Sequence, residues 1–194
     1  MLDNLQKYKV VLASNSPRRQ ELLKSLDIDF KVMVKDGVEE DFPQTLKNRE
    51  VAEYLAVKKA QAYADEVKKD NLLLITSDTI VVCDGLILGK PTDVQEAQEM
   101  LKMLSGKSHK VITGVALTTP HVQRSFSVKT KVYFKRLSDT DIEYYVRKYQ
   151  PFDKAGSYGI QEWIGLVGID YIEGSYHNVM GLPVQRLYAE LQRL

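Results

Sequence analysis

Hydroxyl side chains and two arginines follow a short apolar run near the beginning of the sequence. Residues 10–13 predict a buried strand, and Pro17 suits the first position of a helix, where its missing N–H is no loss. The backbone N–H groups of that helix start, the Ser14 hydroxyl and the guanidinium groups of Arg18 and Arg19 can all donate to phosphate oxygens. The segment therefore predicts an anion-binding loop. The alternative is an ordinary helix cap beside solvated arginines.

A second candidate is Asp78, which lies between the apolar segments 72–75 and 80–83. These segments predict two strands, and burying a carboxylate between them without a partner is costly. We therefore interpret Asp78 as a metal ligand or as a general base for water. The alternative is a turn aspartate that bonds to its neighbours' backbone.

Lys90 follows the next turn signal. Asp84-Gly85 predicts a hairpin that returns the chain through residues 86–88, so Lys90 can reach the same end of the sheet as Asp78. A lysine ammonium is a compact charge that suits phosphate. Taken alone, Lys90 fits an ordinary surface position equally well.

Glycines and small polar residues gather in the segment 153–161, which predicts a loop that can approach a ligand closely. Its final residue, Gln161, offers both a donor and an acceptor, as reading a nucleobase edge requires. The alternative is a glycine-rich connection with Gln161 on the surface. A further segment, residues 174–183, predicts a tight loop before the last helix.

Alternating strand and helix patterns must position these segments. The mixture of crossovers and hairpins predicts an α/β fold with a mixed sheet. Strands are predicted at residues 10–13, 30–34, 72–75, 80–83, 86–88, 111–117, 126–134 and 169–172. Helices are predicted at residues 17–26, at 48–68, from the capping box at 92–95 to 104, at 139–148 after a Ser138 cap, and from Pro183 onward.

Composition narrows the class of protein. A length of 194 residues suits one domain with two lobes around a cleft. The net charge of +1, from 27 basic and 26 acidic residues, argues against a nucleic-acid coat and against a polybasic membrane anchor. Cys83 is the only cysteine, which excludes a disulfide framework and predicts a small core residue, and the three histidines show no metal-ligand spacing. No stretch is long and apolar enough to predict a membrane span, so the cytoplasm is the expected compartment.

Taken together and in this order, the segments resemble the Maf family of nucleotide pyrophosphatases, which is related in fold to the inosine triphosphate pyrophosphatases. The resemblance implies a single domain over residues 8–193, with a mixed twisted sheet, flanking helices and two lobes around a central cleft. The GSYGIQ form of the loop is similar to the branch that hydrolyses dTTP and UTP. The matching stretches are LASNSPRRQELL at 12–23, SDTIVV at 77–82, LGKPTDVQEAQEML at 88–101, LSGKSHKVITGVA at 104–116, FDKAGSYGIQ at 152–161 and GSYHNVMGLP at 174–183.

The resemblance implies roles for nine residues. Asp78 matches the catalytic acid/base of the family and a metal ligand, and Glu40 matches a second metal ligand, although Glu39-Glu40-Asp41 offers three candidate acids. Ser14, Arg18 and Arg19 match the phosphate-binding loop. Lys59 and Lys90 match further residues of the site. Arg18, Thr79 and Gln161 match positions associated with substrate choice. The substrate-binding set is Ser14, Arg18, Arg19, Lys59, Thr79, Lys90 and Gln161.

One departure from the family pattern follows Gln161. The family usually continues with glycine and small residues, whereas this chain has Glu162-Trp163-Ile164. Trp163 could stack on a base or pack against the protein, and as the only tryptophan it is expected to pack.

The resemblance also implies a reaction, a cofactor and partners. The expected reaction splits a nucleoside triphosphate, dTTP, UTP or a modified pyrimidine triphosphate, into monophosphate and pyrophosphate with Mg²⁺ or Mn²⁺. A homodimer is an expectation from the family, and no nucleic-acid or membrane partner is expected. Two alternatives stay open: a pyrophosphatase for 7-methyl-GTP or deaminated purine nucleotides, and a nucleotide-sensing regulator of cell division and septum formation.

Overall fold

The computed structural model describes residues 2–38 and 40–194 and divides the chain into two compact units. Unit 1 comprises Met1–Asp78, Thr113–Val128 and Gly181–Leu194, and unit 2 comprises Thr79–Ile112 and Lys129–Met180. The boundary falls inside three strands, which therefore contribute residues to both units. These strands are β3 (Leu72–Cys83), β5 (Ser108–Thr118) and β6 (Gln123–Phe134).

Parallel and antiparallel pairs both occur in the sheet, which confirms the predicted mixed α/β fold. β1 pairs in parallel with β2 and with β3, whereas β4 pairs antiparallel with β3, and β7 pairs antiparallel with β6. Within the described residues the strand order is β2-β1-β3-β5-β6-β7, with β4 beside β3. The remaining strands are β1 (Lys9–Leu12), β2 (Lys31–Val32), β4 (Leu86–Leu88) and β7 (Ile169–Glu173).

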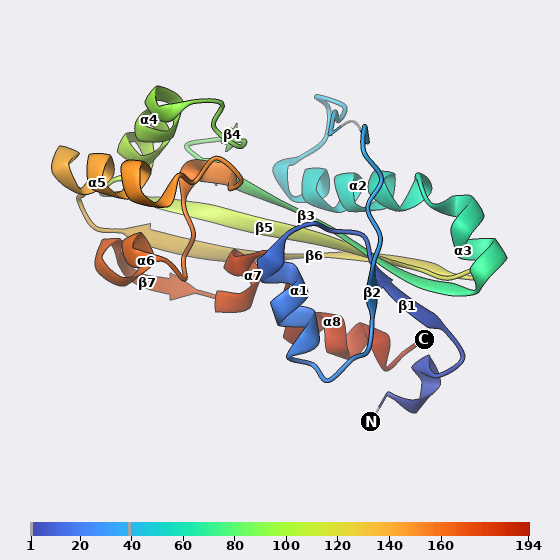
Figure 1. Ribbon diagram of the computed structural model, residues 1–194. Coiled ribbons are helices and arrows are strands. Elements are labelled where there is room, and N and C mark those ends of the chain that lie inside the picture. The colour runs from blue at the N-terminus through green and yellow to red at the C-terminus, as the bar shows by residue number, and fades with distance from the viewer. Residues whose placement is uncertain (1, 39) are drawn as a thin grey trace. The chain divides into compact units, whose positions relative to one another are not determined.

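In unit 1 the helices cover both faces of the parallel strands. Figure 1 shows α2 and α3 on one face of these strands and α1 and α8 on the other. Small side chains line α2 where it meets the strands, so apolar area is buried at close range. The helical elements are η1 (Asp3–Leu5, a 3-10 helix), α1 (Pro17–Lys24), α2 (Asn48–Gln61), α3 (Ala64–Asp70) and α8 (Val184–Leu191). The core includes Val11, Ala56, Ala60, Tyr63, Val67, Leu72, Leu74 and Ala116.

Unit 2 has its own apolar core, which includes Cys83 as predicted. α4 packs against α5, and both bury apolar residues in this core. Trp163 is partly buried and packs against the same core, with its ring edge-to-face on Tyr144 at 4.9 Å, so the predicted packing role is confirmed. The helical elements are α4 (Val94–Leu104), α5 (Asp139–Tyr149), η2 (Ala155–Ser157, a 3-10 helix), α6 (Trp163–Gly168) and α7 (Tyr176–Met180).

The prediction of one helix over residues 48–68 was wrong. α2 ends at Gln61 and α3 begins at Ala64, because Tyr63 leaves the helical path and turns inward. The Tyr63 ring is buried, and its hydroxyl accepts a hydrogen bond from the backbone N–H of Lys35 at 2.8 Å. This contact ties the segment after β2 to the break between the two helices.

The prediction of a break between strands at residues 76–79 was also wrong. β3 runs without interruption from Leu72 to Cys83, because the polar side chains at residues 76–78 find partners inside unit 1. Thr76 donates to the carbonyl of Ala56, and Ser77 donates to the carbonyl of Gly181. A satisfied hydroxyl costs little to bury, so polarity alone does not end a strand here.

Turn and cap signals were more reliable. Asp84 and Gly85 both have positive φ, at 50° and 84°, as a two-residue hairpin turn requires, and Ser138 forms the predicted capping box. At the start of α4 the cap is shifted by one residue from the predicted box, since Asp93 accepts from the N–H of Glu96. The segment 174–183 is not only a loop, because it contains the short helix α7.

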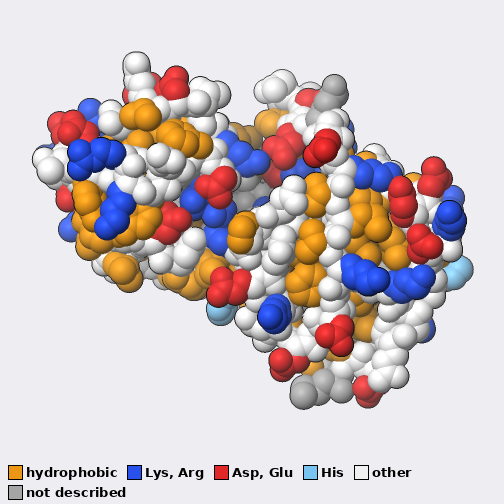
Figure 2. Space-filling model, viewed as in Figure 1, with side chains coloured by type: hydrophobic (Ala, Val, Ile, Leu, Met, Phe, Trp, Pro, Cys, Tyr) orange, Lys and Arg blue, Asp and Glu red, His pale blue; other side chains and the backbone are white. Residues whose placement is uncertain are grey.

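Figure 2 shows acidic and basic side chains interspersed over the visible face, as the near balance of charges in the sequence leads one to expect. Across residues 2–38 and 40–194, no helix has the length and apolar character needed to cross a membrane.

Candidate active site

Asp78 lies at the centre of the candidate site in unit 1. Asp78 is 8% exposed, and its carboxylate oxygen Oδ1 lies 2.5 Å from the Nζ of Lys59 on α2. The same ammonium also donates to Oε1 of Glu40 at 2.8 Å. One lysine therefore links a buried carboxylate to a half-exposed one, and it offsets the cost of burying Asp78.

The position of α2 explains why Lys59 faces Asp78. Side chains two residues apart on a strand share a face, so Thr76 and Asp78 point the same way from β3. Thr76 Oγ1 donates to the carbonyl of Ala56 at 2.7 Å, and Lys59 follows one helical turn later. The hydrogen bond thus sets α2 so that Lys59 lies beside Asp78.

Gly114 on β5 allows the same helix to come close to the sheet. A Cβ added at Gly114 would lie 2.1 Å from the carbonyl oxygen of Ala52 and 2.4 Å from the backbone nitrogen of Glu53. No larger residue fits against the α2 backbone at this distance. Gly114 and Thr76 therefore fix α2 at two neighbouring strands of unit 1.

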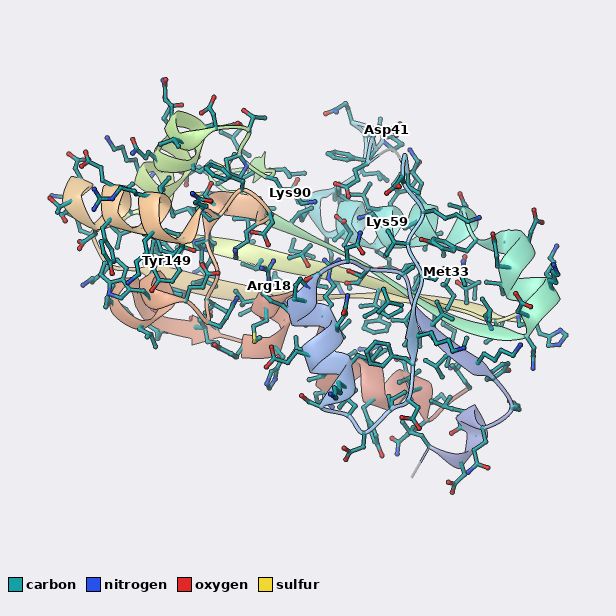
Figure 3. All side chains as sticks on the ribbon, viewed as in Figure 1. Arg18, Met33, Asp41, Lys59, Lys90 and Tyr149 are labelled. Carbon is teal, nitrogen blue, oxygen red and sulfur yellow. The ribbon has the colours of Figure 1, made fainter. Side chains whose placement is uncertain are left out.

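The acidic loop before α2 is tied to that helix by adjacent lysines. Glu40 pairs with Lys59, while Asp41 pairs with Lys58. The hydrogen bond from Lys58 lowers the pKa of the exposed Asp41 carboxyl. Figure 3 shows Lys59 on α2 and Asp41 in the loop. Of the three candidate acids, Glu40 is the described one that reaches the same lysine as Asp78, and Glu39 lies outside the described residues.

The predicted anion-binding segment places Ser14 and the two arginines at the start of α1. Ser14 is buried and its Oγ accepts from the N–H of Ser16 at 3.2 Å. Ser16 occupies the N-cap position with no cap hydrogen bond from its own side chain. Arg18 lies in the first turn, as Figure 3 shows. The helix start thus has the residue types that bind phosphate oxygens.

Arg19 has a second role that sequence analysis did not anticipate. Its Nε donates to the carbonyl of Gly181 at 2.9 Å, and its Nη1 donates to the carbonyl of Ser77 at 2.9 Å. Burial lowers the pKa of this guanidinium and the nearby Asp78 carboxylate opposes that shift. Arg19 therefore connects α1 to β3 and to the loop before α8, within unit 1.

Unit 2 contains the other three residues of the predicted set. Thr79 follows Asp78 on β3 and is the one partly exposed residue of that strand. Lys90 is exposed two residues after the end of β4. Gln161 is partly buried between η2 and α6, and among the described residues its Oε1 is buried with no hydrogen-bond partner. A polar atom in that state is unusual, because buried acceptors nearly always have a donor.

The loop that ends at Gln161 is held by buried tyrosines. Tyr158 and His109 meet through a 2.6 Å contact between the tyrosine hydroxyl and Nε2. Burial lowers the pKa of His109 to about 4, so this ring is neutral at physiological pH. Tyr145 accepts from the N–H of Gly159 at 3.0 Å. His109 therefore has a structural role in unit 2, through its contacts with Tyr158 and Phe134.

The model of a family described as Maf-like protein matches residues 9–194. The chain belongs to the Maf-like protein family. The matched range covers all nine residues of the predicted site.

Individual Maf-like relatives match over their full length. A protein of Phocaeicola vulgatus named dTTP/UTP pyrophosphatase is 58% identical over 194 residues, which cover 100% of both chains. A protein of Bacteroides thetaiotaomicron with the same name is 53% identical over 194 residues, again with 100% of both chains covered. The Ham1 protein of Staphylococcus aureus shares the fold, with a TM-score of 0.54 at 18% identity over 95% of this chain and 98% of that one.

The structure groups the predicted Maf-like site residues within the two units. In unit 1 it brings Asp78, Lys59 and Glu40 into direct contact and places Arg19 beside them through Ser77. Sequence analysis missed Thr76 and Gly114, which position α2. The signal for Gly114 was its place inside an apolar strand, where a glycine often marks a close backbone approach.

Proposed function

We propose that this chain is a nucleoside triphosphate pyrophosphatase that hydrolyses dTTP and UTP to the monophosphate and pyrophosphate in the cytoplasm. The observation that carries the proposal is the meeting of Asp78 and Glu40 at the ammonium of Lys59. Two carboxylates that meet at one positive charge can also hold a divalent metal ion that binds a phosphate group. The names of the full-length relatives support the substrate class.

Residues of unit 1 supply the groups for the triphosphate. The N–H groups at the start of α1, the Ser14 hydroxyl and Arg18 donate to phosphate oxygens. Arg19, held by carbonyls of Ser77 and Gly181, adds a fixed positive charge. Lys59 exchanges a carboxylate for a phosphate oxygen when the substrate enters.

Divalent metal binding fits the donor set. Mg²⁺ and Mn²⁺ prefer oxygen ligands and are often held by one or two carboxylates together with substrate phosphates. Asp78 and Glu40 provide two such carboxylates, since both already converge on one cation, Lys59. Among residues 2–38 and 40–194 no third His, Cys, Asp or Glu completes a metal cluster, so phosphate and water would have to supply any further ligands of a bound ion. When bound, the ion stabilises the charge that develops on the pyrophosphate leaving group.

Asp78 is the proposed general base. A carboxylate accepts the proton of the attacking water as the water oxygen bonds to the α-phosphorus. The anhydride bond between the α- and β-phosphates breaks, and pyrophosphate leaves with the bonding electron pair. Lys59 and the arginines of unit 1 oppose the growing negative charge, which is the effect that preorganised donors have in such sites.

Residues of unit 2 supply base recognition in this proposal. Gln161 has a buried amide oxygen without a partner among the described residues, and Thr79 is a partly exposed residue with a hydroxyl group. Both can form hydrogen bonds with the edge of a pyrimidine ring.

The test is a panel of nucleoside triphosphates incubated with the purified protein and Mg²⁺, Mn²⁺ or EDTA, with products identified by chromatography. Monophosphate and pyrophosphate from dTTP and UTP, lost with EDTA, are the expected result. Preference for 7-methyl-GTP or a deaminated purine would keep the reaction and overturn the substrate. Tight nucleotide binding without turnover would overturn the enzyme and favour the regulator.

A further inference from the structure

Lys59 contacts both of the carboxylates that are proposed to hold a metal ion. Its Nζ lies 2.5 Å from Oδ1 of Asp78 and 2.8 Å from Oε1 of Glu40. The side chains of Lys59 and Asp78 are 18% and 12% exposed, so water and salt screen this ion pair little. A divalent cation that bound both carboxylates would therefore compete with the ammonium for them.

The backbone on each side of the ion pair is fixed, so the competing ammonium is built into the fold of unit 1. Asp78 belongs to the long strand β3, and Lys59 belongs to α2. The hydrogen bond from Thr76 to the carbonyl of Ala56 joins that strand to that helix. A metal ion can displace the ammonium from Asp78 only if the Lys59 side chain finds another partner, because an unpaired charge in a mostly buried place is costly.

The surrounding charges also disfavour a free cation. Burial lowers the pKa of the Arg19 guanidinium. The Asp78 and Glu40 carboxylates raise that pKa and Arg18 lowers it, so these charges lie within range of one another. With Lys59, the group comprises three positive and two negative charges. A free divalent cation therefore approaches a net positive group, which repels it.

A nucleoside triphosphate reverses both effects. It brings several negative charges, and its phosphate oxygens can accept hydrogen bonds from the Lys59 ammonium in place of the carboxylates. It also brings oxygen ligands, whereas no third His, Cys, Asp or Glu within residues 2–38 and 40–194 joins Asp78 and Glu40 in a metal-binding group. Mg²⁺ is commonly held in this way, by one or two carboxylates together with substrate phosphates.

We propose that Lys59 is an internal counter-ion that keeps free divalent metal out of the site until a nucleoside triphosphate arrives. The inference rests on the proposed function. Lys59 bridges Asp78 and Glu40 when no nucleotide is bound, and it transfers to phosphate oxygens as the metal and the nucleotide enter together. Because coupling between two ligands is reciprocal, the nucleotide tightens metal binding by the same factor as the metal tightens nucleotide binding.

The experiment measures Mn²⁺ binding through the electron paramagnetic resonance signal of the free ion. Each protein is titrated with and without a UTP analogue that carries a methylene group between its α- and β-phosphorus atoms and is not hydrolysed. For the wild type, we expect the analogue to tighten Mn²⁺ binding by about a hundredfold. Without the analogue, Lys59→Met should bind Mn²⁺ about tenfold more tightly than the wild type does.

The two ligands should respond to Lys59→Met in opposite directions. The variant should bind the analogue more weakly than the wild type does in the presence of Mn²⁺, because the phosphates lose an ammonium. A purely structural role for Lys59 would weaken the binding of both ligands. Lys59→Gln removes the charge and keeps a hydrogen-bond donor for the carboxylates, so it should fold even if Lys59→Met does not, and its Mn²⁺ affinity should rise as well.

The matched control is Lys58→Met, which removes the same charge at the neighbouring residue, where Lys58 pairs with the exposed Asp41. Its Mn²⁺ affinity without the analogue should equal that of the wild type. The double variant with Asp78→Asn and Lys59→Met should lose the gain in affinity, because the gained site includes the Asp78 carboxylate. A gain that persisted in the double variant would contradict the inference.

Two further results would overturn the inference alone, in a wild type that hydrolyses UTP. The first is Mn²⁺ binding without the analogue that is no tighter in Lys59→Met and Lys59→Gln than in the wild type. The second is a wild type that binds Mn²⁺ equally tightly with and without the analogue. A wild type that bound no Mn²⁺ under either condition and released no pyrophosphate from any nucleoside triphosphate would overturn the proposed function as well.

Discussion

Thr76 and Asp78 lie on the same face of β3, and each side chain reaches α2. The first contact is a hydrogen bond to the carbonyl of Ala56, and the second is an ion pair with Lys59. Thr76 and Asp78 are two residues apart on the strand, and the residues that they contact, Ala56 and Lys59, are three residues apart on the helix. As a result, the backbone contact that packs α2 on the sheet also aligns its lysine with the buried carboxylate.

Asp78→Asn should abolish pyrophosphate release and leave the fold intact. The amide keeps the size of the side chain but cannot accept the proton of water, and removing a preorganised group of this kind costs on the order of a hundredfold or more in rate. Pyrophosphate release from UTP measures the effect, and circular dichroism checks the fold. Turnover close to that of the wild type would sink the assignment.

Lys59→Met should lower the rate by on the order of a hundredfold, because the phosphates and both carboxylates lose a shared cation. The neighbouring Lys58→Met is the matched control, since Lys58 pairs with the exposed Asp41. The control should keep nearly all its activity in the same assay. An equal loss of activity in both variants would indicate that the loop before α2 is required for activity. It would contradict a specific role for Lys59.

Gln161→Ala should relax base choice more than it changes metal dependence. The substitution removes an amide of unit 2 and leaves the carboxylates of Asp78 and Glu40 untouched. The measurement is the ratio of UTP to GTP hydrolysis across a titration of Mg²⁺, with Gln95→Ala on α4 as the control. A ratio that stayed at the wild-type value would mean that Gln161 does not read the base.

Gly114→Ala should destabilise the protein strongly. The added Cβ would lie 2.1 Å from the carbonyl oxygen of Ala52, so α2 must move away from β5. Overpacking of this kind costs about 1–3 kcal/mol or more, and activity should fall further because Lys59 moves with the helix. Urea unfolding measures the free energy. Gly89→Ala, whose added Cβ meets nothing within 4 Å, is the control and should unfold like the wild type.

Because His109 is buried, we expect the free energy of unfolding to decrease in mild acid. Its pKa is about 4 in the folded protein against 6.5 for the ordinary side chain, so between these values the unfolded chain binds a proton that the folded one does not. The free energy of unfolding should therefore decrease as the pH falls from 6.5 toward 4, by about 3 kcal/mol in total, with no loss above 6.5. Urea unfolding across this range should show a shallower dependence in His109→Gln. The exposed His121→Gln should retain the wild-type dependence; a shallow slope in both variants would assign the effect to another group.

The sequence predicted most elements and the contacting site residues of unit 1. It did not reveal the long-range contacts that place those residues beside one another. Apolar runs and turn residues such as Asp84-Gly85 act locally, and the elements they define were found. Thr76 looked like a break because its acceptor, the carbonyl of Ala56, belongs to a helix twenty residues earlier. Lys59 came from the resemblance alone, since nothing in its own neighbourhood indicates that it faces Asp78.

The same distinction applies to the Gln161 loop. Gln161 was chosen because an amide can read a base, which depends only on residue type. The buried contacts of Glu162 with Tyr145 and Lys154 depend on packing between α5 and the loop, and no periodicity reveals them. Arg19 was expected to bind phosphate, and its contacts with the carbonyls of Ser77 and Gly181 could not be inferred from neighbours in the sequence.

The makeup of unit 1 has a consequence for the order of events on the ribosome. The carbonyl of Gly181 fixes both Arg19 and Ser77, and Leu187 and Leu191 of α8 are fully buried. Gly181 follows Ser77 by 104 residues and Arg19 by 162 residues. All segments of unit 2 emerge before residue 181. The proposed phosphate-binding and catalytic groups of unit 1 therefore acquire their final support only after the segment that carries Gly181 and α8 has been synthesised.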